Sequence, residues 1–128
     1  MPLFTMTMKA NRSTKEKDRL SRIIHAASVA AEYPEDDLFQ RFLSLDPSDL
    51  SVDPYYPALP KPRSDQTLMI RTFQGRRPTG KEVLWPHWSK KLGEAGVDPN
   101  DIMVFLSETD RASGSLGGGQ FAPPVTLA

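Results

Sequence analysis

The hydrophobic period changes twice within the first third of the chain. Residues 3–8 alternate between apolar and polar side chains, which predicts a half-buried strand. Apolar residues then recur at helical spacing behind Ser13 and Glu16, a pair with the spacing of a capping box. We expect this helix to end before Pro34, because proline disfavours helix in the residue that precedes it. A second strand is expected over residues 38–45.

The same succession appears again in the second half. Residues 67–73 predict a strand, residues 79–82 repeat the capping-box spacing, and a second apolar helical face leads to a stop at Gly96. Pro86 falls inside this helix, where it should kink the chain or end the first turns early. The continuous apolar run 102–106 is typical of a central strand.

The two successions match at an offset of about 64 residues. Matching polar residues lie at the start of each helix and before each second strand: Arg12 with Arg76, Ser13 with Thr79, and Asp37 with Asp101. We therefore expect one domain over residues 1–128, with duplicated β-α-β halves at about 2–45 and 66–107. Right-handed crossovers then give an α/β (α+β) fold, a four-stranded mixed sheet with two helices on one face. The other face is left bare, and oligomerisation is the simplest way to cover it.

Two segments fall outside the repeat. The connection 46–65 carries five prolines and is expected to be extended or turn-rich. Loops of this length are usually functional or disordered. The C-terminal tail, residues 111–128, is rich in glycine and is expected to be irregular.

Composition narrows the classes of function. The chain holds 16 basic and 16 acidic residues, so its formal net charge is zero, which disfavours nucleic-acid and membrane-surface partners. One local stretch, residues 61–91, holds eight basic and two acidic residues with three aromatics and keeps nucleic-acid binding as a further hypothesis. The sequence has no cysteine, which excludes disulfides and thiolate chemistry.

No targeting or metal-binding pattern is visible. The N-terminus lacks the pattern of a signal peptide, and no apolar run approaches the roughly 20 residues of a membrane span, so we expect a cytoplasmic protein without a membrane partner. His25 and His87 lie on the predicted helices with no metal-ligand constellation around them. We expect neither a metal nor a cofactor.

Short motifs over nearly the whole chain resemble those of one family. A Met-Pro start leads into a strand, and the later motifs keep the family's order and spacing. They are Arg12-Ser13, Pro34–Gln40, Asp53–Tyr56, Arg63–Asp65, Gly75-Arg76 with Lys81, Asp98–Asp101, Ser115–Gly117 and Gln120-Phe121. The chain resembles the tautomerase superfamily, and within it the malonate semialdehyde decarboxylase branch. The resemblance implies a trimer of duplicated β-α-β units, the fold of macrophage migration inhibitory factor.

The resemblance assigns the chemistry to Pro2, Asp37 and Arg76. Once Met1 is removed, Pro2 offers a secondary amine, and burial or a nearby guanidinium lowers the pKa of such an amine towards neutrality. By resemblance, Arg76 binds the substrate carboxylate and Asp37 works with the proline. Taken without the resemblance, Pro2 is a plain strand start, Arg76 a surface arginine and Asp37 a turn or cap residue.

Substrate binding departs from the family pattern. The branch has a second arginine where this chain has Gln74, and Arg71 or Arg77 could supply the missing charge. The branch also has an aromatic wall around a segment that reads Gly114–Gly117 here. The apolar candidates that remain to line the pocket are Phe39, Leu116 and Phe121.

The function implied by this resemblance is keto–enol tautomerisation of a small oxo-carboxylate by a homotrimer. Malonate semialdehyde decarboxylase or hydratase activity is the alternative within the family. A non-catalytic, cytokine-like binding protein on the same fold is the alternative of another class, since the superfamily includes macrophage migration inhibitory factor.

Overall fold

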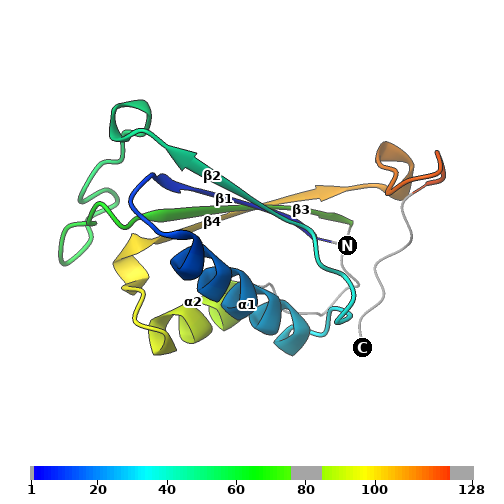
Figure 1. Ribbon diagram of the computed structural model, residues 1–128, viewed down its shortest axis with the longest axis horizontal. Helices are drawn as coiled ribbons and strands as arrows, with labels where there is room; N and C mark the ends of the chain where they lie inside the picture. The colour runs from blue at the N-terminus through cyan, green and yellow to red at the C-terminus, as the bar shows by residue number, and fades with distance from the viewer. Residues whose placement is uncertain (1, 76–84, 122–128) are drawn as a thin grey trace.

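The chain forms one four-stranded sheet with both helices on the same face (Figure 1). The computed structural model describes residues 2–75 and 85–121, with the backbone alone for Gln74, residues 85–88 and Arg111. The main elements are β1 (Pro2–Lys9), α1 (Thr14–Ala30), β2 (Gln40–Leu45), β3 (Leu68–Gly75), α2 (Trp85–Glu94) and β4 (Ile102–Thr109). Three short 3-10 turns, η1 to η3, span Pro47–Asp49, Pro99–Asp101 and Arg111–Ser113.

The strand order confirms the duplicated unit. The sheet runs β2-β1-β3-β4, with β1 parallel to β2 and β3 parallel to β4. The central pair, β1 and β3, is antiparallel. Each half is thus a β-α-β crossover, and the two halves meet along the middle of a mixed sheet.

Alternation in the strands sorts side chains between the two faces. Every second residue of β1 from Pro2 onward is buried, as the sequence predicts. The buried residues meet α1 and α2 in one core made of Phe4, Met6, Met8, Leu20, Ile24, Ala27, Ala31, Tyr33, Leu68, Ile70 and Leu92. Because this core is confined to the helix side, the opposite side of the sheet is left without a cover.

The predicted capping box begins α1. The Ser13 hydroxyl accepts a hydrogen bond from the Glu16 N–H at 3.1 Å, and the Glu16 carboxylate accepts from the Ser13 N–H at 3.3 Å. The helix ends in a second hydrogen-bonded motif ahead of Pro34. Glu32 takes a positive φ of 73°, and the Tyr33 N–H donates to the Ser28 carbonyl at 3.1 Å.

Replacing Ser13 with alanine should destabilise the fold by about 1 kcal/mol, because the Glu16 backbone N–H loses its hydroxyl partner. Urea unfolding of Ser13→Ala measures the loss. The matched control is Ser89→Ala, at an exposed position inside α2, which should be neutral or slightly stabilising. Equal destabilisation by both changes would contradict a capping role.

Helix α2 ends as predicted at Gly96. This residue has a φ of 90°, and the Val97 N–H donates to the Leu92 carbonyl at 2.9 Å, the same motif that ends α1. Pro86 lies in the first turn of the described helix, where a missing N–H costs no intrahelical bond. The second predicted capping box, residues 79–82, lies outside the described residues.

Two sequence expectations about the strands need correction. The second strand starts at Gln40 rather than at residue 38, so Leu38 and Phe39 precede it. The apolar run in β4 is not a central strand, because β4 lies at an edge of the sheet. Its apolar character has another cause: Val104 packs on the core, while Phe105 points to the uncovered face and is 59% exposed.

Candidate active site

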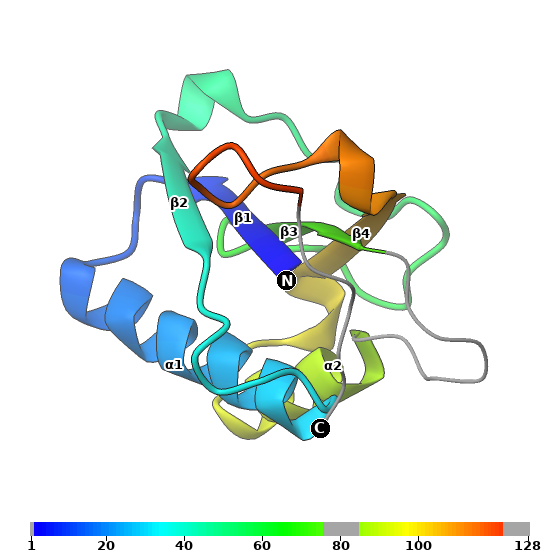
Figure 2. The ribbon, with the colours of Figure 1, turned by 90° about the vertical axis from the view of Figure 1, so that its right-hand side faces the viewer.

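Pro2 begins β1 at one end of the sheet, the end that Figure 2 views. It is buried, and its register partner across the antiparallel pair is Gln74. On its other side the Phe4 N–H donates to the Phe39 carbonyl at 3.0 Å, so the segment that enters β2 runs beside the start of β1. The end of β1 is therefore enclosed by backbone from both halves of the chain.

Two other predicted site residues, Asp37 and Gln74, lie on the backbone segments that flank Pro2. Asp37 lies two positions before Phe39, is half-buried and donates its backbone N–H to the Pro34 carbonyl at 3.2 Å. Gln74 reaches Pro2 through the β1–β3 pairing. Arg76 itself lies outside the described residues, but it follows Gly75, the last residue of β3.

Helix α1 holds the segment that carries Asp37. His25 Nε2 lies 2.8 Å from the Glu35 carbonyl, and the Ser21 hydroxyl donates to Gln40 Oε1 at 2.5 Å. The Gln40 amide returns a hydrogen bond to the Ser21 carbonyl at 3.1 Å. These hydrogen bonds hold the backbone on either side of Asp37 against α1.

Sequence reasoning missed the part played by Ser21 and His25. It considered His25 only as a possible metal ligand and found no constellation around it. A signal was present, because the two residues are four apart and therefore share one face of α1. The sequence did not say which segment that face would meet.

Arg71 lies on the face of the sheet away from the core. It alternates with the buried Ile70 and Thr72, so its side chain points to the uncovered face of the sheet. There its guanidinium lies over the Phe73 ring, 5.0 Å from the centroid. The expectation that Arg71 compensates for Gln74 stays a prediction.

The three apolar candidates are exposed. Phe39 is 40% exposed beside the start of β1, while Leu116 and Phe121 are 43% and 69% exposed in the tail. Figure 2 shows this tail, from η3 onward, beyond the end of β4 and in front of the sheet. The described part of a single chain therefore does not form an apolar wall around Pro2.

The described residues offer neither a metal site nor a membrane span. No three histidine, aspartate or glutamate side chains gather there as a metal site would require. Neither described helix is long and apolar enough to cross a bilayer.

Solved structures resemble the chain along most of its length. A malonate semialdehyde decarboxylase inhibited by 3-bromopropiolate superposes with a TM-score of 0.80 at 24% identity, over 91% of this chain and 90% of that one. Another malonate semialdehyde decarboxylase, described with decarboxylase and hydratase activities, gives 0.82 at 22% identity and 92% coverage of each chain. A fused 4-OT, described as an asymmetric trimer, gives 0.73 at 18% identity over 92% and 94%. These likenesses establish the fold.

Sequence comparison establishes the family. A search of curated proteins gives no significant match. The family model described as tautomerase enzyme matches residues 37–117, which is more than half of the chain and begins at Asp37. The resemblance inferred from the sequence motifs is therefore confirmed, and the chain belongs to the tautomerase family.

Proposed function

We propose that the chain is an enzyme that interconverts the keto and enol forms of a small oxo-carboxylate. The observation that carries this proposal is the position of Pro2. Pro2 is buried at the start of β1, beside the segment that carries Asp37. Across the sheet it pairs with Gln74, which precedes Arg76 by two residues. Removal of Met1 would convert the Pro2 nitrogen into a free secondary amine at that position.

Burial of Pro2 favours the neutral form of its amine, which can act as a base. An ammonium is costly in apolar surroundings, so an amine at the buried end of β1 should be neutral at lower pH than a solvated one. The neutral Pro2 nitrogen would take a proton from the carbon next to the carbonyl. The electron pair of that C–H bond forms the C=C bond of the enol, and the π pair of the carbonyl moves to its oxygen, which takes the proton held by the prolyl cation. The Arg76 guanidinium would hold the substrate carboxylate, and Asp37 would orient the prolyl cation.

Decarboxylation or hydration of malonate semialdehyde is the alternative within the family. Two structurally similar proteins are malonate semialdehyde decarboxylases, which favours this alternative. Gln74 speaks against it, because a neutral amide replaces the second arginine of that branch. In this reaction the bond to the carboxylate carbon breaks, CO₂ leaves, and the electron pair moves to the aldehyde.

A substrate panel separates these activities from a purely binding role. The chain is first checked by intact mass for loss of Met1 and is then offered phenylenolpyruvate and malonate semialdehyde. We expect measurable tautomerisation of phenylenolpyruvate and slower CO₂ release from malonate semialdehyde. The reverse ranking would favour the decarboxylase alternative. No turnover of either substrate by a chain without Met1 would favour the non-catalytic, cytokine-like role.

We also propose that the chain assembles as a homotrimer. The uncovered face of the sheet exposes large apolar side chains, including Leu43, Phe73 and Phe105. A structurally similar fused 4-OT is described as a trimer.

Sedimentation velocity at micromolar concentration should give a trimer, and Phe105→Lys should shift the chain towards monomer. Tyr56→Lys, at an exposed position in the proline-rich connection, is the control and should leave the assembly intact. A monomeric wild-type chain would refute the assignment.

A further inference from the structure

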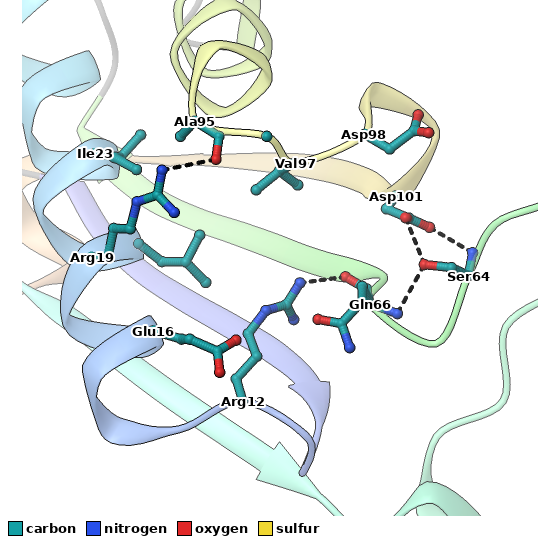
Figure 3. Close-up of a pocket in the computed structure, with 12 residues that line it drawn as sticks. Arg12, Glu16, Arg19, Ile23, Ser64, Gln66, Ala95, Val97, Asp98 and Asp101 are labelled. Carbon is teal, nitrogen blue, oxygen red and sulfur yellow. Dashed lines mark hydrogen bonds between the residues drawn. The ribbon is translucent and has the colours of Figure 1, made fainter.

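A hollow of about 270 Å³ opens at the end of the sheet opposite Pro2 (Figure 3). It lies between the first turns of α1, the segment before β3 and the connection from α2 to β4. Arg12, just before the N-cap of α1, and Arg19, on α1, both extend toward it. We propose that this hollow is a second, non-catalytic site, which binds a short-chain monocarboxylate between the two guanidinium groups.

Among the described residues, the hydrogen bonds of the two arginines go to neutral acceptors. Arg12 donates to the Gln66 carbonyl at 2.6 Å and to the Met8 sulfur at 3.8 Å. Arg19 donates to the Ala95 carbonyl at 3.0 Å. Burial lowers the pKa of Arg12, while the nearby carboxylates act in the opposite direction. A guanidinium has five N–H donors, so both side chains keep donors for an anion.

The carboxylates around the hollow already have partners. Asp101 is 6% exposed and accepts from the Ser64 N–H and hydroxyl, both at 2.7 Å. Asp98 pairs with Lys61, and Glu16 caps α1. Glu16 still opposes negative charge, because it lines the hollow and falls between the two arginines in the sequence. Attraction by two guanidinium groups and repulsion by one carboxylate together favour a ligand of single negative charge over a doubly charged one.

The rest of the lining is apolar. Leu20 and Ile23 from α1 face Ala95 and Val97 from the end of α2. A hydrocarbon tail of a few carbons could cover these side chains while its carboxylate meets the arginines. The lining therefore favours a carboxylate with a short tail over an inorganic anion.

The duplication of the β-α-β unit gives a reason for a second site at the end of the sheet opposite Pro2. Helices α1 and α2 end in the same motif at Glu32 and Gly96, and these positions differ by the same 64 residues that separate Asp37 from Asp101. The position that corresponds to Pro2 is then Gln66. Its nitrogen is a backbone amide inside the chain, so this end lacks a counterpart of the prolyl amine, and we assign the hollow a binding role alone.

Titration with sodium butyrate, followed by amide NMR of the full chain, tests the proposal. We expect saturable shifts at Gln66, Ala95, Gly96 and Val97. Arg19→Gln should weaken binding roughly tenfold, as expected for loss of one hydrogen bond to a charged group. The matched control is Arg22→Gln, an exposed arginine on α1 that does not line the hollow, which should bind normally.

Three further arms make the result decisive. Arg76→Ala should retain the shifts at these four amides, which separates this hollow from the Pro2 end. Inorganic phosphate should bind more weakly than butyrate, because it has no tail. Arg12→Gln should also weaken binding if its spectrum remains that of a folded chain. Shifts confined to the Pro2 end, equal binding by Arg19→Gln, or tighter binding of phosphate would overturn the proposal.

Discussion

A chain in which residues still precede Pro2 is expected to lose tautomerase activity by about 10²–10⁴-fold, the usual contribution of a positioned acid–base group. Acylation turns the Pro2 nitrogen into a tertiary amide, which cannot take a proton at neutral pH. The comparison needs one preparation with a removable N-terminal tag, assayed before and after cleavage to a free Pro2. Both forms should fold alike, because the register of β1 does not depend on the charge at its first nitrogen.

Pro2→Ala refines this test. Alanine keeps a free primary amine at the same place, so activity should fall without vanishing. Its amine is less constrained than the proline ring, and its position relative to the substrate should therefore be poorer. Full activity in Pro2→Ala, or in the tagged chain, would contradict a mechanism through the prolyl amine.

Arg76→Ala should lower kcat/KM for carboxylate substrates by roughly 30- to 1,000-fold. The estimate corresponds to the loss of about 2–4 kcal/mol from a hydrogen-bonded charge pair. Arg76 follows the end of β3, and β3 pairs with Pro2 at Gln74, so its carboxylate contact would lie near the amine. If the contact is equally strong in the ground and transition states, the loss should appear mainly in KM.

Two neighbouring arginines serve as controls for Arg76. Arg71→Ala tests the charge on the uncovered face, where the guanidinium lies over Phe73, and it should lower kcat/KM less than Arg76→Ala does. Arg77→Ala tests the other adjacent charge. An uncharged carbonyl substrate should be insensitive to Arg76→Ala, which separates carboxylate binding from an effect on Pro2. If Arg76→Ala stays within twofold of wild type while either control abolishes turnover, the anion site must be rebuilt around that control residue.

Local rules accounted for much of the fold. The capping box at Ser13 and Glu16 needs only the spacing of two residues, and the alternation in β1 needs only the pleat of a strand. The stop at Gly96 follows from a backbone angle that glycine adopts at little cost. Such features are visible in sequence because they depend on neighbours along the chain.

Features that depend on distant packing were not visible. The run in β4 is apolar on both faces, and periodicity alone could not say that one face meets the helices and the other lies open at a sheet edge. Likewise, His25 gains its role only because the segment after Pro34 runs back along α1. The position of Arg71 on the uncovered face could have been foreseen, since Arg71 alternates with the apolar Ile70 in one strand.

The hollow at the other end of the sheet also depends on distant packing and could not be predicted from the sequence. From the sequence, Arg12 and Asp101 were known as repeat partners of Arg76 and Asp37 and as parts of family motifs, not as neighbours of a cavity. Their contacts with Gln66 and Ser64 depend on how the proline-rich connection returns to β3. Alignment of the two halves therefore indicated which positions are equivalent. It did not indicate that Arg12 and Arg19 line one hollow.

The central claim is that a free amine on Pro2 performs the chemistry. The most direct measurement is peptide mapping by mass spectrometry after inactivation with 2-oxo-3-pentynoate, an electrophile that carries its ketone beside a carboxylate. A neutral amine adds to its activated triple bond. We predict one adduct per chain, located on Pro2 of a peptide without Met1, and formed at the rate at which activity disappears. Complete inactivation with the adduct on another residue, or full modification of Pro2 with activity retained, would contradict the account.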